Sequence, residues 1–256
     1  MNTVHKGMWA ALAALVVAQI CYPLTGGTAR AALVIATVTA GCALSVWHAS
    51  ATRGARTAGT LVLITMGGGL LVEVIGLATG FPFGRYEYTG ALGPRLLGVP
   101  IVIPLAWTWM AWPAFLVAGR LTRTPALRIV VAGFALAAWD LFLDPQMVAA
   151  GFWHWRDAAV TLPAVAGVPV TNYLGWLAVA VLMMALLMLV SGGTVGRQDG
   201  PMYGLYLWTY YSSVLAHAVF LDLPGSAAWG AVAMGAVAIP LTAALVRVPV
   251  ARAVAS

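Results

Sequence analysis

The chain has 256 residues, of which 62% are hydrophobic and only 8% are charged, with a formal net charge of +6. Soluble domains carry about 25% charged residues, so this composition leaves too little polar surface for a soluble fold. The 13 basic residues are scattered singly and in pairs rather than gathered in a stripe, which argues against binding of nucleic acid. Repeated apolar runs of about 20 residues instead predict an all-α, polytopic membrane protein.

Eight apolar segments are long enough to be membrane-spanning helices, and together they form one membrane domain over residues 1–256. They are expected at residues 8–24, 31–50, 58–79, 98–119, 126–147, 168–190, 202–221 and 227–247. Cys21 and Cys42 fall within the first two segments and show no metal-ligand spacing, so they are interpreted as small core residues. No metal site is expected.

The basic residues lie unequally beyond alternate ends of these segments. Nine fall on one side: Lys6, Arg53, Arg56, Arg120, Arg123, Arg128, Arg197, Arg247 and Arg252. Four fall on the other: Arg30, Arg85, Arg95 and Arg156. The positive-inside rule therefore predicts cytoplasmic termini, with the plasma membrane as the expected location.

The third and fourth segments resemble the fifth and sixth, which suggests a parallel internal repeat. The sequence GFPFGR at 80–85 matches GFWHWR at 151–156, and the same offset of 71 aligns Glu73 with Asp144. Further along, GVPIVIPLAW at 98–107 matches GVPVTNYLGW at 167–176. Such a repeat predicts two carboxylates at equivalent depth facing one cavity. The alternative is coincidence, because Gly-Val-Pro commonly begins a helix and aromatic residues favour membrane interfaces.

Three carboxylic acids lie inside predicted spans: Glu73, Asp140 and Asp144. Each costs roughly 2.5–3.5 kcal/mol on insertion scales, so each is a candidate for function. Asp140 and Asp144 are four residues apart and share one helix face, where like charges repel. Pro145 is expected to end the helix at Asp144. These features predict at least one neutral acid able to donate a proton.

The alternative for these acids is structural pairing with the loop arginines Arg85, Arg95 or Arg156. Some aromatic residues fall beside the acids and could instead stabilise a transient cation through their π faces: Tyr86, Tyr88, Trp139, Trp153 and Trp155. His217 in the seventh segment is interpreted as hydrogen-bonded to a neighbouring helix. A neutral acid in an aromatic pocket, without a nucleotide loop or a cofactor motif, suits protonation of an alkene.

Three segments in order carry a family resemblance: FPFGRYEYTGALGP (81–94), WDLFLDPQMVAAGFWHWR (139–156) and GVPVTNYLGW (167–176). They resemble the membrane-integral carotenoid hydratases, which include γ-carotene 1′-hydratases and bisanhydrobacterioruberin hydratases. The resemblance covers about residues 60–220, the motif-bearing core. It implies cofactor-free hydration of the terminal ψ-end of an acyclic or monocyclic carotenoid. Lycopene, γ-carotene and a longer C50 precursor are the candidate substrates, and membrane lipids and other carotenoid enzymes are the expected partners.

The predicted mechanism begins with protonation of C2 by Asp144 or Asp140, which leaves a tertiary cation at C1. Glu73 is then expected to orient and deprotonate the water that captures this cation. The substrate-binding candidates are Arg85, Tyr86, Tyr88, Trp139, Trp153, His154 and Asn172. Among them, Tyr86, Trp139 and Trp153 are expected to line the cationic end. His154 and Asn172 are expected to position water.

Arg85 is expected either to tether Glu87 or to keep Glu73 ionised. Two other functions fit the same residues. A cyclase would quench the cation with an internal double bond, and a carotenoid-binding or transport protein would perform no chemistry. Transport is disfavoured because the three acids cluster toward one side of the predicted membrane domain.

Overall fold

The structure is a computed structural model that describes residues 3–191, 196 and 198–247. The α-helices are α1 (Thr3–Ile20), α2 (Gly27–Arg53), α3 (Ala55–Leu61), α4 (Gly68–Thr79), α5 (Val102–Leu121), α6 (Pro125–Ala137), α7 (Asp140–Ala149), α8 (Val170–Ser191), α9 (Gly200–Leu215) and α10 (Pro224–Val246). Two π-helical turns lie at Val62–Gly67 and Ala216–Phe220, and two 3₁₀ turns at Tyr22–Leu24 and Gly90–Leu92. The strands are β1 (Tyr86–Tyr88), β2 (Arg95–Leu96), β3 (Val99–Pro100) and β4 (Trp153–Trp155). Arg197 and Arg252, counted above on the basic side, lie outside the described residues.

The predicted helical membrane fold is confirmed. Among the described residues, seven helical runs are long and apolar enough to cross a membrane: Thr3–Leu24, Gly27–Arg53, Ala55–Thr79, Val102–Leu121, Pro125–Ala149, Val170–Ser191 and Pro224–Val246. Each overlaps one predicted span. The remaining predicted span, 202–221, coincides with α9 and the π-helical turn after it, but this run is not one of the seven. The chain is therefore a multi-pass membrane protein.

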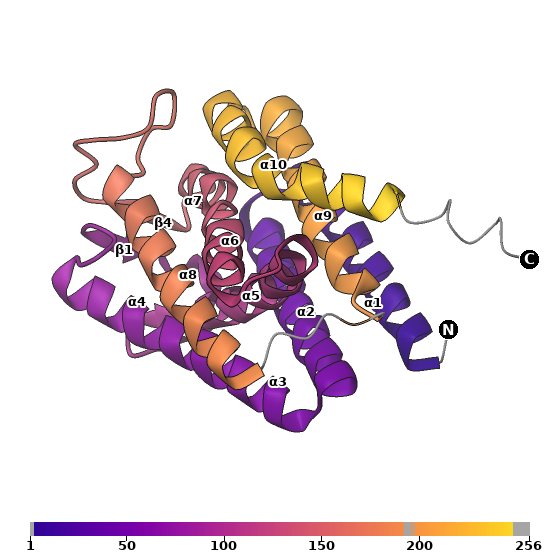
Figure 1. Cartoon of the computed structure of the whole chain (residues 1–256). Coiled ribbons are helices and arrows are strands. Elements are labelled where there is room, and N and C mark those ends of the chain that lie inside the picture. The colour runs from indigo at the N-terminus through magenta and orange to yellow at the C-terminus, as the bar shows by residue number, and fades with distance from the viewer. Residues whose placement is uncertain (1–2, 192–195, 197, 248–256) are drawn as a thin grey trace, which may run out of the picture.

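Helix α5 lies in the middle of the bundle (Figure 1) and packs against α2, α6 and α9. In its most apolar stretch 89% of residues are buried, compared with 17% in the first span. Glycine also permits a close approach between the backbones of α6 and α8. A Cβ atom at Gly133 would lie only 2.8 Å from the Cα atom of Val181. Small residues of this kind let membrane helices pack backbone against backbone.

The two units of the proposed repeat have matching elements. The helical runs Ala55–Thr79 and Pro125–Ala149 each contain 25 residues. Glycines with positive φ follow both runs and precede both partner helices: Gly80, Gly151, Gly98 and Gly167. Each run also contains an irregular turn shortly before its acid, a π-helical turn in the first and a break between α6 and α7 in the second. The symmetry axis itself stays a prediction.

The expected helix end at Asp144 is wrong, because α7 continues through Pro145 to Ala149. Proline has no N–H to donate to the carbonyl four residues earlier, which is that of Leu141. Ser226 in α10 supplies the missing donor, with its hydroxyl 2.6 Å from the Leu141 oxygen. His217 is hydrogen-bonded to Ser226 as well, as expected for a histidine that bonds a neighbouring helix. The neighbouring helix therefore satisfies the carbonyl that proline leaves free.

The interruption falls earlier, between α6 and α7. The backbone N–H of Trp139 donates to the Leu136 carbonyl at 3.3 Å, one residue short of the α-helical partner. The carbonyl of Ala135 is thereby released, and the Tyr206 hydroxyl of α9 donates to it at 3.2 Å. The break starts a new helix at Asp140 and so sets the direction in which both aspartates point.

Replacement of Ser226 by alanine should destabilise the protein by roughly 1–3 kcal/mol, because the Leu141 carbonyl loses its donor in a buried site. Thermal unfolding in detergent would measure this loss. Pro145→Ala provides the matched background, since alanine restores a backbone N–H for Leu141, and there Ser226→Ala should have little effect. Equal losses in both backgrounds would show that Ser226 acts through His217 instead.

Candidate active site

Strands β1 and β4 pair to form a short antiparallel ribbon over one end of the bundle. Its register joins Tyr86 to Trp155, Glu87 to His154 and Tyr88 to Trp153. Because side chains alternate along a strand, one face of the ribbon carries four rings and the other carries Glu87 and His154. The four rings point into the bundle and lie over the acids.

The acids of two separate helices converge beneath this ribbon. Glu73 from α4, Asp144 from α7 and Asn172 from α8 line one cavity of about 30 Å³. All three are buried, with 4%, 3% and 2% of their surface exposed. The rings around them are those of Tyr86, Tyr88, Trp153, Trp155 and Trp176. The expected meeting of Glu73 with Asp144 is therefore present.

Glu73 accepts two hydrogen bonds from tyrosines on one oxygen. The Tyr86 hydroxyl lies 2.5 Å from Oε2, and the Tyr88 hydroxyl lies 2.8 Å from the same atom. Burial raises the pKa of both tyrosines, and the nearby Glu73 carboxylate raises each pKa further. Both hydroxyls therefore remain neutral donors, and their hydrogen bonds offset part of the cost of burying a carboxylate at Glu73.

Asp140 and Asp144 share a single nitrogen of Asn172. Its Nδ2 atom donates to Asp140 Oδ2 at 2.9 Å and also to Asp144 Oδ2. The Trp153 indole donates to the other oxygen of Asp144 at 3.1 Å. Asp140 is fully buried, and its Oδ1 atom has no hydrogen-bond partner among the described residues. Asp144 borders the cavity, while Asp140 lies behind it against the same amide.

Arg85 forms neither of the two ion pairs expected of it, with Glu87 or with Glu73, among the described residues. Arg85 is exposed, and Glu87 pairs instead with Arg156, while the His154 ring lies 3.9 Å from the same carboxylate. The β1–β4 register explains the difference, because it brings the second loop beside the first. The side chain of His154 is 58% exposed on the outward face of the ribbon, away from the water it was expected to position.

Trp139 is the third correction. Its buried ring packs edge-on against Trp109, with ring centroids 5.4 Å apart, and it lines a different, larger cavity. The sequence analysis placed Trp155 beside the acids but missed Trp176 as a ring of the acid site. Trp155 donates to the Phe83 carbonyl at 2.8 Å, and Trp176 stacks on Trp107 with centroids 3.9 Å apart.

Replacement of Tyr88 by phenylalanine should lower turnover by roughly tenfold, since hydrogen bonds to charged groups contribute about 1.5–3 kcal/mol. Tyr210→Phe is the control, because that hydroxyl bonds the Ala231 carbonyl outside the acid cavity. Because burial raises the pKa of Tyr88, no tyrosine ionisation should reduce activity below pH about 10. Steady-state kinetics across pH would check both points. An alkaline loss near pH 9 that Tyr88→Phe removes would contradict them.

The comparison with known families bears directly on this site. The profile of the carotenoid biosynthesis protein family matches residues 29–242, which include all the acids and the ribbon. The chain belongs to the carotenoid biosynthesis protein family. This assignment places the protein in carotenoid biosynthesis.

One curated relative within this comparison is the bisanhydrobacterioruberin hydratase of Haloarcula japonica. It is 36% identical over 120 residues, which are 44% of this chain and 39% of the relative. The chain thus aligns with well under half of that protein. The resemblance to carotenoid hydratases drawn from the three motifs is confirmed. No solved structure matches the chain.

Proposed function

We propose that this member of the carotenoid biosynthesis family adds water across the terminal C1–C2 double bond of an acyclic or monocyclic carotenoid, without a cofactor. The observation that carries the proposal is the pairing of unlike carboxyl sites across one small cavity. Glu73 accepts two tyrosine hydroxyls on one oxygen, whereas Asp144 shares an amide nitrogen with another acid. Acid and base chemistry in one enzyme requires two such environments.

The first step is proton transfer from Asp144 to C2. Two adjacent carboxylates buried away from bulk solvent repel, so the Asp140–Asp144 pair retains one proton between them. Asp144 delivers it, because Asp144 borders the cavity and Asp140 does not. The π electrons of the double bond form the C2–H bond, and C1 becomes a tertiary cation. The surrounding tyrosine and tryptophan rings stabilise that charge.

The second step is capture of the cation by water. A cavity of about 30 Å³ is large enough for one water molecule, which needs roughly 10–15 Å³. Glu73 accepts one proton from this water as its oxygen bonds to C1, so the product is a tertiary alcohol. After this step Asp144 has lost its proton, and Glu73 has gained one. A water molecule that bridges the two acids returns the proton for the next cycle.

Product mass tests the proposal and separates it from cyclisation. Purified protein in lipid nanodiscs would receive lycopene in water enriched in heavy oxygen. Hydration adds one labelled water to the substrate mass, whereas a cyclase changes no mass and a binding protein forms no product. Unchanged lycopene that remains bound to the protein would reject hydration. Parallel reactions with γ-carotene and a C50 precursor would identify the preferred substrate.

The remaining expectations concern location. We infer insertion in the plasma membrane with both termini in the cytoplasm, because seven of the eleven described basic residues belong to the side opposite the ribbon. The acid site would then lie near the outer surface. A carotenoid would reach it from the lipid phase, beside other enzymes of the same biosynthesis. Protease accessibility of terminal tags in sealed cells would test the orientation.

A further inference from the structure

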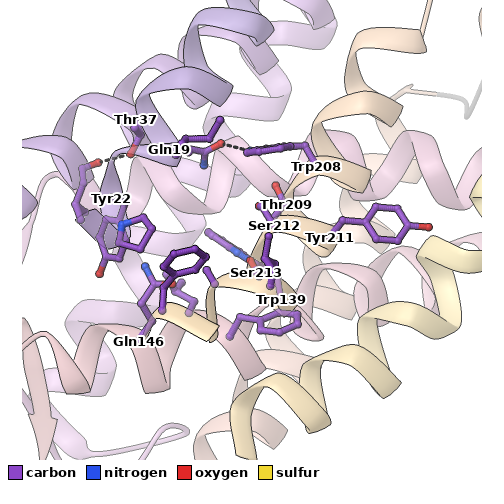
Figure 2. Close-up of a pocket in the computed structure, with 18 of the residues that line it drawn as sticks. Gln19, Tyr22, Thr37, Trp139, Gln146, Trp208, Thr209, Tyr211, Ser212 and Ser213 are labelled. Carbon is purple, nitrogen blue, oxygen red and sulfur yellow. Dashed lines mark hydrogen bonds between the residues drawn. The ribbon is translucent and has the colours of Figure 1, made fainter. Parts of the chain in front are cut away.

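A second cavity of about 420 Å³ lies beside α7 (Figure 2). Residues of α2, α5, α7 and α9, together with the end of α1, form its walls. Its volume falls within the roughly 300–1,000 Å³ of typical small-molecule sites. The acid cavity, at about 30 Å³, is far smaller and cannot enclose the end of a carotenoid.

Several polar side chains of this larger cavity are paired within the protein. The Trp208 indole donates to Gln19 at 2.9 Å, and these two residues join α1 and α9 in Figure 2. The hydroxyls of Thr37 and Thr209 donate to backbone carbonyls of their own helices, at 2.7 Å and 2.9 Å. These groups therefore require no polar ligand. The Tyr22 hydroxyl is an exception, since it is buried without a hydrogen-bond partner among the described residues, but the lining is mainly apolar.

Among the described residues, a single side chain borders both cavities, that of Leu143. Trp139, Leu143 and Gln146 are spaced to lie on one face of α7, which lines the larger cavity. Asp144 follows Leu143 and is therefore turned roughly 100° around the helix, toward the acids. An alkene in the larger cavity would thus be separated from the proposed proton donor by the leucine side chain.

The rim of the larger cavity is exposed, while its floor is buried. Leu24, Leu215 and Phe220 are 70%, 56% and 52% exposed, and all three line the cavity. At the floor, Trp139 and Phe142 are 4% and 1% exposed. Because the exposed side chains are apolar and lie at the ends of apolar helices, the rim faces the lipid phase.

We propose that this cavity binds the polyene segment next to the reacting end of the carotenoid. The substrate enters across the rim at Leu24 and Phe220, and its end group passes Leu143 to reach Asp144. The inference rests on the proposed hydration, since it connects a lipid-facing cavity to that acid. The side chain of Leu143 must move aside, because the acid cavity is too small for an end group.

The chemistry of the walls favours a polyene over a lipid acyl chain. Lipid tails are as apolar as the cavity, so the hydrophobic effect alone does not select a ligand from the membrane. A conjugated polyene is already rigid and loses little conformational entropy on confinement, whereas a flexible acyl chain loses much. The rings of Trp109 and Trp139 supply rigid aromatic surface on one wall.

Binding of lycopene to the Asp144→Asn variant tests the proposal separately from catalysis. Ser213→Phe in α9 and Val38→Phe in α2 would each fill the cavity from a different helix. Each should reduce co-purified lycopene at least tenfold, as measured by polyene absorbance per protein. Leu182→Phe, at a 60% exposed position of α8, is the matched control and should bind normally. Unfolding temperatures would identify a variant that fails to fold. In that case the second cavity-filling variant tests the proposal.

Lycopene retained by a folded, cavity-filled variant would overturn the proposal. The proposal would also fail if filling the cavity released a bound phospholipid together with the lycopene, as detected by mass spectrometry, because the cavity would then be a lipid site. The route past α7 has its own test in the native Asp144 background. Leu143→Phe should retain lycopene and lose at least tenfold in product formation, and unchanged product would exclude this route. Lycopene bound in the cavity by a protein that never forms alcohol would reject hydration while the binding site stands.

Discussion

Asp144→Asn should reduce alcohol formation by roughly 10²–10⁴-fold, because positioned general acids typically contribute that factor. The amide retains the shape of the carboxyl group, and its one oxygen can accept from either the Trp153 indole or the Asn172 amide nitrogen, both of which donate to Asp144 now. It cannot protonate an alkene. Product formation from lycopene in nanodiscs would measure the loss, and co-purified lycopene would show that the substrate still binds.

Asp140→Asn is the matched control for this experiment. Asp140 contacts the same Asn172 nitrogen but does not border the acid cavity. Its amide should therefore cause a smaller loss, through altered placement and charge of Asp144 rather than through the transferred proton. If Asp140→Asn were inactive while Asp144→Asn remained active, the two aspartates would have the opposite roles.

The sequence was sufficient for the helices and for the meeting of the acids. Apolar runs mark the spans, and a charged residue inside such a run is conspicuous because its insertion is costly. The alignment of Glu73 with Asp144 correctly anticipated two acids at one cavity. The Asn172 bridge between Asp140 and Asp144 requires α8 to pack beside α7 with Asn172 next to both aspartates. No local sequence pattern could predict this packing.

The errors have a common physical origin in contacts between distant segments. Pro145 behaves as a helix end when only its own segment is considered, but Ser226 in another helix satisfies the released carbonyl. Arg85 is the nearer arginine in sequence to Glu87, yet the ribbon register gives that acid to Arg156. The large cavity arises from gaps between side chains of five helices, of which α1 and α2 lie before the motif-bearing core.

Glu73→Gln should separate protonation from water capture. Glutamine can still accept hydrogen bonds from Tyr86 and Tyr88, which contact Glu73 now, but it cannot take a proton from water. Asp144 remains able to protonate C2, so the cation forms and then returns its proton instead of gaining oxygen. Alcohol formation should therefore fall by roughly 10²-fold or more, the usual contribution of a general base.

Heavy water provides the readout that distinguishes this defect from a loss of the acid. In deuterated buffer, Glu73→Gln should introduce deuterium at C2 of recovered lycopene without hydration, because each reversed protonation can leave a deuteron behind. Asp144→Asn should introduce none, and the double variant should behave like Asp144→Asn because the base acts only after the cation exists. Mass spectrometry of the recovered substrate measures the label. Full hydration by Glu73→Gln would remove this residue from water capture, and absence of both label and product would instead assign it to the protonation step.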